Sequence, residues 1–300
     1  MTETLQKPAD DLVAAFQIEG WPVRGRIVRL GDSVHEILTR HDYPEAVANL
    51  LGEACALAAL VGSSLKFDGR LIVQAQGDGP VAYVVVDYDT DGAMRGYCRF
   101  DADRLAEVST GFVRPGAQAL LGKGVFIMTV DQGPDMDRYQ GITPIEGETL
   151  ALCAEQYFDQ SEQTPTKIRL AVGQVDTGEG PTWRAGGILI QNIASDEARG
   201  STADVWERAQ ALFLTTAEDE LIDPLLSSET LLWRLFNEDG VRVFEPKPLR
   251  AFCRCSPERI ATVIESFTSE ERAEMVEPDG KIHVTCEYCS RVYAMDPDAA

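Results

Sequence analysis

Hydrophobic and polar positions in the first 195 residues form blocks that are typical of short strands and packed helices. Residues 43–65 make a long, alanine-rich apolar run with helical spacing, which predicts one or two packed helices. Residues 149–163 show the same spacing, with apolar side chains on one face at Leu150, Cys153, Ala154 and Tyr157. Shorter strand-like runs lie at 70–76, 81–88, 93–100, 123–131, 138–145, 166–176 and 182–193.

The connections between these runs predict that the strands are antiparallel. Gly77-Asp78-Gly79-Pro80 separates the runs 70–76 and 81–88, which is a hairpin signal. A glycine-rich loop at 178–180 separates the runs 166–176 and 182–193 in the same way. We therefore expect residues 1–195 to form an α+β core domain with antiparallel sheet and packed helices.

Residues 196–240 have a different character, with eleven acidic residues against three basic ones. Two apolar helical faces are expected, at Val205, Ala209, Leu212 and Phe213 and at Leu231, Leu232, Leu235 and Phe236. Thr216 and Asp219 resemble a capping box, and Pro224 interrupts the run. Helices this short are unstable alone, so residues 196–250 are predicted to be a metastable helical linker that lies on another part of the chain. Residues 240–251 read as a strand and a proline-containing hinge.

The last fifty residues, 251–300, predict a small separate domain. Ser256-Pro257 begins a helix whose apolar face is Ile260, Val263, Ile264 and Phe267. Thr268 and Glu271 form a capping-box pattern for a second helix. A Pro278-Asp279-Gly280 turn then leads into expected strands at 281–285 and 291–295.

Composition and charge exclude several classes of partner and location. The chain has 27 basic and 49 acidic residues and a net charge of −22, so binding to nucleic acid or to an anionic membrane surface is disfavoured. The N-terminal residues lack a basic region followed by an apolar core, and no run of eighteen apolar residues occurs. We therefore expect a cytoplasmic protein with reduced thiols.

Four of the seven cysteines fall within 37 positions, and their spacing predicts a metal site. Cys253 and Cys255 form a CxC pair, and Cys286 and Cys289 form a CxxC pair thirty residues further on. The segment 251–300 offers about ten apolar side chains for a core, which is few for an independent domain. Four thiolates around one Zn²⁺ would stabilise it.

Other uses of these cysteines remain as alternatives. A permanent structural zinc site fits the spacing, whereas a thioredoxin-like motif lacks the βα context, and structural disulfides do not suit a reducing compartment. His283 is expected at the surface, because strand alternation places it with Lys281 and Thr285. A disulfide within the CxC pair would close a small strained ring that is easily reduced, which favours a reversible switch. Oxidation would then eject zinc and unfold the lobe.

Two other classes of function are less well supported by the residues. A nucleic-acid-binding zinc protein predicts basic residues near the cysteines, but 251–300 holds five basic and ten acidic residues. An enzyme lacks support, because neither a phosphate-binding loop nor a dinucleotide fingerprint is present and His35 and His41 leave little general-base chemistry. A Cys/His nucleophile pair is the enzymatic alternative left open, but we expect no catalytic site.

The sequence resembles the redox-regulated 33-kilodalton heat-shock holdase chaperones of bacteria. The pattern CxC-x30-CxxC, followed by an aromatic-containing strand, is characteristic of that family. Segments that resemble the family lie along nearly the whole chain. The glycine-rich segment "DTGEGPTWRAGG" departs modestly from the family's pattern. The similar blocks are "HDYPEAVANLLGEA", "LKFDGRLIVQAQGDGPV", "MRGYCRF", "DRYQGITPIEGETLA" and "YFDQSEQTPT".

The resemblance implies a redox-regulated, ATP-independent holdase. It makes Cys253, Cys255, Cys286 and Cys289 the ligands of one zinc ion in the reduced, inactive form. Oxidation would form the disulfides Cys253–Cys255 and Cys286–Cys289, release zinc, unfold the lobe and linker, and expose an apolar surface that binds unfolding client proteins. The oxidised form would be a homodimer. The alternative is a constitutive holdase with a structural zinc site.

The remaining cysteines match nothing in this switch. Cys55, Cys98 and Cys153 have apolar neighbours, so we expect buried core thiols.

Overall fold

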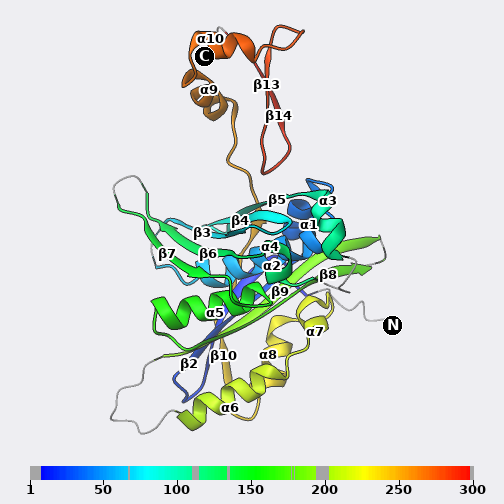
Figure 1. Cartoon of the computed structure of the whole chain (residues 1–300). Helices are drawn as coiled ribbons and strands as arrows, with labels where there is room; N and C mark the ends of the chain where they lie inside the picture. Colours follow the sequence, from blue (N-terminus) through cyan, green and yellow to red (C-terminus); the bar gives the residue numbers. More distant parts are fainter. Residues whose placement is uncertain are drawn as a thin grey trace.

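The computed structural model describes residues 8–66, 68–109, 115–133, 136–176, 178, 180–193 and 203–297 (Figure 1). The α+β prediction with antiparallel sheets is confirmed, because two six-stranded sheets contain mainly antiparallel pairs. The expected boundary between core and linker at 195/196 lies outside the described residues, as does residue 179 of the glycine-rich loop.

The first sheet combines early, middle and late parts of the chain. Its strands are β1 (Leu12–Ile18), β2 (Val23–Leu30), β8 (Thr166–Asp176), β9 (Pro181–Asn192), β10 (Val241–Val243) and β11 (Lys247–Pro248). The strand order is β10-β1-β2-β9-β8, with β11 also paired to β1, and every pair is antiparallel. The β8–β9 hairpin was predicted, with the two strands continuing into the glycine-rich turn.

The second sheet is formed mainly by the middle of the chain. Its strands are β3 (Arg70–Gly77), β4 (Val81–Asp89), β5 (Ala93–Phe100), β6 (Gly124–Asp131), β7 (Tyr139–Pro144) and β12 (Arg250–Ala251). The order is β12-β5-β4-β3-β6-β7, and only the short β12–β5 pair is parallel. The hairpin predicted at Gly77–Pro80 joins β3 to β4.

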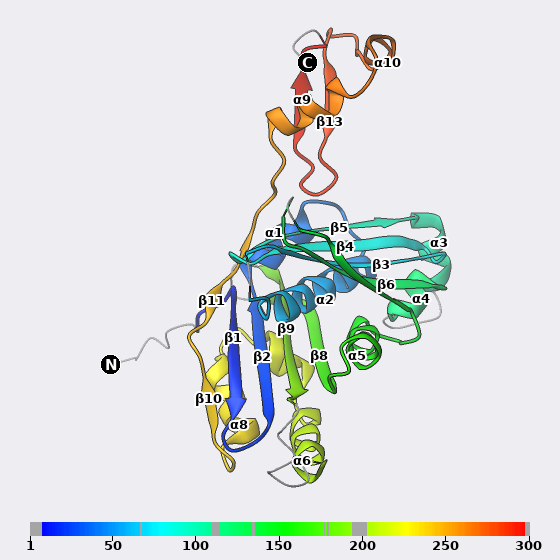
Figure 2. The same ribbon diagram turned by 90° about the vertical axis from the view of Figure 1, so that its left-hand side faces the viewer.

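A buried helix, α2 (Glu45–Gly62), lies between the two sheets (Figure 2). Fifteen of its eighteen residues are buried, and they form one core with residues of both sheets and of helix α5 (Leu150–Ser161). The helix is apolar and long enough to cross a membrane, but its burial between the sheets identifies it as the central helix of the core.

Three short helices cover the outer face of the first sheet. They are α6 (Ala203–Leu214), α7 (Glu218–Ile222) and α8 (Ser228–Phe236), which we call the covering helices. A second apolar core lies beneath them and includes the predicted face residues Ala209, Phe213, Leu231, Leu232, Leu235 and Phe236. The expectation that these amphipathic helices lie on another part of the chain is confirmed, and that part is the sheet face containing Phe16, Ile27 and Ile188.

The C-terminal lobe, residues 253–297, extends beyond the second sheet on the side of β5 (Figures 1 and 2). It contains helices α9 (Pro257–Glu265) and α10 (Ser269–Glu274) and the antiparallel hairpin of β13 (Ile282–Thr285) and β14 (Val292–Met295). The chain reaches this lobe from the covering helices through β10 and β11 on the first sheet and β12 on the second. One short path therefore connects the lobe, both sheets and the covering helices.

Several elements differ from the sequence-based expectations. The strands β1 and β2 and the helices α1 (Asp32–Thr39), α3 (Ala102–Ser109) and α4 (Ala117–Leu121) were not predicted. The capping box predicted at Thr216 and Asp219 is wrong. Helix α7 begins one residue later, where the Ala217 N–H donates to Glu220 Oε2 at 3.1 Å, because Thr216 N–H donates to Phe213 O and ends α6.

We expect Phe236→Ala to loosen the covering helices. The Phe236 side chain is fully buried and stacks on Phe16, with ring centroids 5.9 Å apart. Its truncation should destabilise their packing by about 3–5 kcal/mol. Limited proteolysis of the folded protein should show faster cleavage within residues 203–243. Trp233→Ala on the same helix, where the side chain is 63% exposed, is the control. Equal cleavage rates for the two variants would contradict the packing described here.

Candidate metal centre

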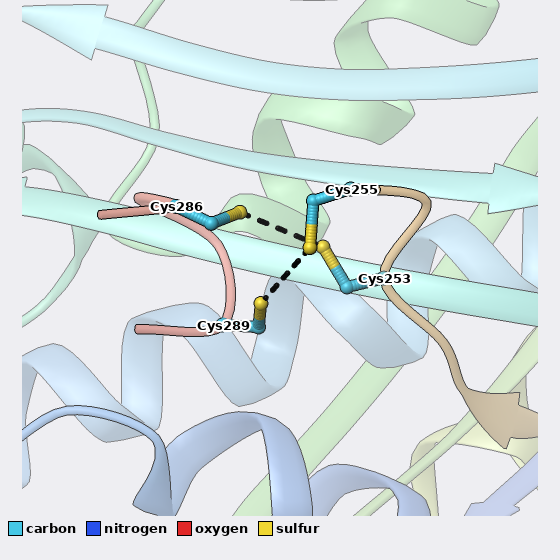
Figure 3. Close-up of side chains that lie close together, drawn as sticks. All are labelled: Cys253, Cys255, Cys286 and Cys289. Atoms are coloured by element: carbon cyan, nitrogen blue, oxygen red, sulfur yellow. Dashed lines mark hydrogen bonds between the residues drawn. The ribbon is translucent and has the colours of Figure 1, made fainter. Parts of the chain in front are cut away.

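Two separate segments bring the four cysteines together (Figure 3). Cys253 and Cys255 lie on irregular chain between β12 and α9. The next residue, Ser256, caps α9 by accepting a hydrogen bond from Arg259 N–H at 3.3 Å, so the helix begins directly after the CxC pair. Cys286 and Cys289 lie in the turn that joins β13 to β14. The structure therefore brings together all four of the predicted ligands.

The sulfur positions fit a single tetrahedral metal ion. All four Sγ atoms lie within 4.8 Å of one another, with 3.7 Å between Cys253 and Cys286 and 3.3 Å between Cys255 and Cys289. A tetrahedral ion with metal–sulfur bonds of about 2.3 Å places its sulfur ligands about 3.8 Å apart. The four cysteines are free thiols in this structure.

The CxxC turn directs main-chain N–H groups at the sulfurs. Ser290 N–H donates to Cys286 O at 2.8 Å, and Cys286 N–H donates to Arg291 O at 2.9 Å, which closes a tight loop. Ser290 has a φ of 56°, a left-handed conformation that the turn requires. The N–H groups of Tyr288 and Cys289 face the Cys286 sulfur and stabilise its thiolate.

Without a cation, the cluster does not favour four thiolates at neutral pH. Burial raises the pKa of Cys286, and it also raises the pKa of Cys289, to about 12. Burial also opposes ionisation of Cys255, but hydrogen bonds from Tyr293 and the other thiols outweigh it and bring the pKa of Cys255 to about 7. The Tyr293 hydroxyl lies 3.1 Å from the Cys255 sulfur. A divalent cation would remove this conflict by balancing the negative charge.

The lobe around the cluster has a smaller apolar core than its sequence predicts. Of the predicted face of α9, Ile264 is buried, whereas Val263 is 56% exposed and Phe267 is 38% exposed. Ile282 and Tyr293 are the other buried apolar side chains among the described residues of the lobe. The expectation that all four residues of this face belong to the core is therefore wrong, because α10 and one hairpin are too few elements to surround α9. The small apolar core agrees with the expectation that a metal ion would stabilise the lobe.

Arg254, the residue between Cys253 and Cys255, fixes the CxC pair to the second sheet. Its guanidinium makes a hydrogen-bonded ion pair with Asp87 and lies 3.2 Å from Asp89 Oδ1, and both carboxylates belong to β4. The side chains of Arg254 and Asp87 are 12% and 5% exposed, so this ion pair is shielded from solvent. The CxC pair is therefore held against the core by the residue inside it.

The CxxC turn contacts the same region of the core. Arg95 on β5 pairs with Asp87 at 2.8 Å, and its guanidinium lies 3.9 Å from the centre of the Tyr288 ring. Ser290 Oγ donates to Arg40 O at 2.9 Å. Arg95 also approaches the Cys253 sulfur, at 4.0 Å. Both cysteine pairs thus lie against the outer side of β4 and β5.

The other candidate residues lie away from this cluster. Cys55, Cys98 and Cys153 are buried in the core as predicted, and burial raises the pKa of Cys55 to about 12 and raises that of Cys98 and of Cys153. His283 lies at the surface, as predicted, with Nε2 2.8 Å from Asp279. The roles of Arg254, Asp87, Arg95 and Tyr293 were not predicted. The position of Arg254 between two cysteines was the one signal available in the sequence.

Comparisons with known proteins identify the family of this chain. Residues 11–296 match the model of the family described as Hsp33 protein. A 33 kDa chaperonin of Caulobacter vibrioides is 77% identical over 97% of this chain and 96% of that protein. A 33 kDa chaperonin of Aliivibrio fischeri is 36% identical over 96% of this chain and 93% of that protein.

A solved structure has the same fold. The crystal structure of a 33 kDa chaperonin, an Hsp33 homologue from Thermotoga maritima, superposes with a TM-score of 0.78. It covers 96% of each chain at 22% sequence identity. The family match spans nearly the whole chain, and the closely similar relatives carry the same family's name. The chain therefore belongs to the Hsp33 family.

Proposed function

We propose that this protein is a redox-regulated, ATP-independent chaperone that holds unfolding proteins. In the reduced form Cys253, Cys255, Cys286 and Cys289 bind one Zn²⁺, and the protein is inactive. Oxidation forms the disulfides Cys253–Cys255 and Cys286–Cys289, with loss of the zinc ion. The lobe and the covering helices then unfold and expose the apolar face of the first sheet to clients. The names of the relatives support the chaperone activity.

The proposal divides the chain into three functional parts. Residues 1–195 are the client-binding core, 196–250 are the metastable linker that contains the covering helices, and 251–300 are the zinc-binding redox switch. The core has its own buried helix and two sheets, which support independent stability. The covering helices are short and depend on packing, which supports a low free energy of release.

The observation that carries the proposal is the coincidence of four clustered thiols with a lobe that buries few apolar side chains. Four thiolates are the ligand set of structural zinc, and zinc binding contributes about 10–16 kcal/mol to the folding of such small domains. Loss of that contribution exceeds what three buried apolar residues supply, at about 1.5–3 kcal/mol each. The lobe therefore folds with the metal and unfolds without it.

Oxidation removes the ligand set by forming two bonds. Each S–S bond forms from two thiolates, whose two electrons pass to one molecule of hydrogen peroxide. The O–O bond of the peroxide breaks, and two protons from solvent complete two molecules of water. A disulfide sulfur carries no charge and is a poor ligand, so oxidation of both pairs leaves no thiolate for zinc. The four ligand cysteines are half-buried, so a peroxide can reach them more readily than it reaches the buried thiols of Cys55, Cys98 and Cys153.

The path from the lobe to the covering helices is short. β12 has two residues and β10 has three, so the connection between the lobe and the covering helices is held by few hydrogen bonds. When the lobe unfolds, the Arg254 contacts with β4 are lost and this connection loses its anchor. The chain that follows α8 is then no longer held in place, which weakens the attachment of the covering helices.

The proposed function also includes the partners, the oligomeric state and the location of the protein. Partners are unfolded or partly unfolded proteins, and the oxidised form is a homodimer in the cytoplasm. The net charge of −22 supports solubility of the client complex and disfavours nucleic acid and membrane as partners. No catalytic step is proposed.

Light scattering from a heat-unfolded client protein tests the switch. We expect the zinc-loaded, reduced protein to leave aggregation unchanged and the peroxide-treated protein to suppress it, with one zinc ion released per chain. A variant in which all four ligand cysteines are replaced by serine should bind no zinc and suppress aggregation without oxidation. Equal suppression by the reduced and oxidised wild type would instead favour a constitutive holdase with a structural zinc site, and no suppression by either would contradict the chaperone.

We expect Arg254→Gln to release zinc on oxidation at a lower temperature than the wild type. The variant keeps all four cysteines but loses the shielded ion pair with Asp87 and the contact with Asp89, which are worth about 1.5–3 kcal/mol as charged hydrogen bonds. Zinc release measured with a chromogenic chelator should therefore begin at a lower temperature at the same peroxide concentration. Arg138→Gln, which removes a 68% exposed arginine of the same core domain, is the control. Identical release from the two variants would mean that docking on β4 does not stabilise the lobe.

A further inference from the structure

The face of the first sheet beneath the covering helices carries three arginines among its apolar residues. Arg29 lies on β2, Arg169 on β8 and Arg184 on β9. Arg29 is 1% exposed and Arg184 is 2% exposed, which is unusual for a guanidinium. We call Arg29, Arg169 and Arg184 the arginine row. A surface intended only to pack apolar helices would not need these charges.

The arginine row donates hydrogen bonds to main-chain carbonyls of the covering helices. Arg169 Nη1 donates to Leu214 O at 3.0 Å, at the end of α6. Arg184 Nε donates to Ile222 O at 2.7 Å, at the end of α7. Arg29 donates to Glu220 O at 3.4 Å and to Asp223 O, also at the end of α7. The acceptors are main-chain carbonyls, so these hydrogen bonds do not depend on which side chains the covering helices carry.

Gly186, two residues from Arg184 on the same face, lets the main chain of α7 lie directly on the sheet. A Cβ atom at this position would be 2.1 Å from Leu221 O, which is too close for two non-bonded atoms. The sheet therefore has a local gap in its side chains, beside two guanidinium groups, that a peptide backbone fills. Gly186 and the arginine row are separate features of the sheet, and both accommodate a peptide main chain.

The core domain holds the central guanidinium in place before any partner arrives. Asp10 accepts two hydrogen bonds from Arg184, at 2.7 and 2.6 Å, and lies 3.7 Å from Arg29 Nε. Asp10 precedes β1 and belongs to the core, so this pairing does not depend on the covering helices. The bonds to Asp10 use Nη1 and Nη2 of Arg184, so Nε is left to donate to the Ile222 carbonyl. The Arg184 donor is therefore preorganised, which favours binding.

We propose that the arginine row and Gly186 bind the main-chain carbonyls of unfolding clients once the covering helices have left. In the reduced form, α6 and α7 occupy this site with their own carbonyls. The inference rests on the proposed function and adds its recognition chemistry. Apolar surface alone leaves the exposed carbonyls of a client without donors, whereas charged donors satisfy them whatever the client's sequence. The ligand class is an apolar peptide segment with unpaired carbonyls.

The test measures the affinity of oxidised protein for an end-capped apolar peptide that carries no ionisable side chain. An arginine effect on this probe cannot come from acidic side chains of the ligand. Arg169→Gln is the main variant, because Arg169 is only partly buried and its loss leaves the core intact. Arg184→Gln and Gly186→Ala are further variants, each checked for folding and zinc content in the reduced form. Arg242→Gln on β10 of the same sheet, 68% exposed, is the matched control.

We expect Arg169→Gln and Arg184→Gln each to weaken peptide binding by about tenfold, the loss of one charged hydrogen bond, and Arg242→Gln to leave it unchanged. Gly186→Ala should also weaken binding, because the added methyl group keeps the backbone off the sheet. If wild type binds the peptide and all variants match Arg242→Gln within about twofold, the arginines only cap the covering helices and the inference is overturned. If oxidised wild type neither binds the peptide nor suppresses aggregation, the proposed function fails together with the inference.

Discussion

The C-terminal lobe combines a very small apolar core with four clustered thiols, and the proposed function follows from this combination. Ile264, Ile282 and Tyr293 are the apolar residues that its described part buries. The sulfurs of the two cysteine pairs lie within 4.8 Å of one another, where uncompensated negative charge would repel. In the proposed function, folding of the lobe and binding of the metal are a single event, so chemistry that consumes the thiolates acts directly on the fold.

The lobe is attached to the rest of the molecule at two levels, through which the proposed unfolding would reach the covering helices. Arg254, placed between two ligand cysteines, pairs with Asp87 and Asp89 on β4. The preceding chain adds β12 to one sheet and β10 and β11 to the other before it reaches the covering helices. The covering helices in turn bury an apolar sheet face and give their terminal carbonyls to the arginine row. The lobe with its small apolar core, the short connection and the covering helices are thus joined one after another, and each contacts the next.

Much of this organisation follows from local sequence signals. The hairpins, the central helix and the faces of α6 and α8 follow from hydrophobic periodicity, and the cysteine spacing locates the thiol cluster. The strands β1 and β2 were missed although "LVAAFQIEGWPVRGRIVRL" alternates around a glycine-containing turn, because three arginines make β2 read as polar. Arg29 is buried there beside Asp10 and donates to the carbonyls of Glu220 and Asp223, which lie more than 190 positions away and which no local pattern reveals. The Arg254 contacts with β4 are likewise long-range. The exposure of Val263 and Phe267 depends on how few elements the lobe has around α9.

Hydrogen–deuterium exchange of the intact chain, compared between the zinc-loaded reduced form and the peroxide-oxidised form, tests whether the thiol cluster controls the covering helices. We expect oxidation to remove protection from the amides of the C-terminal lobe and of residues 203–236 together, while the amides of α2 and of the central strands β2, β3 and β4 remain protected. Retention of protection in the covering helices while the lobe exchanges freely would contradict the account, because the thiol cluster would then control only its own lobe.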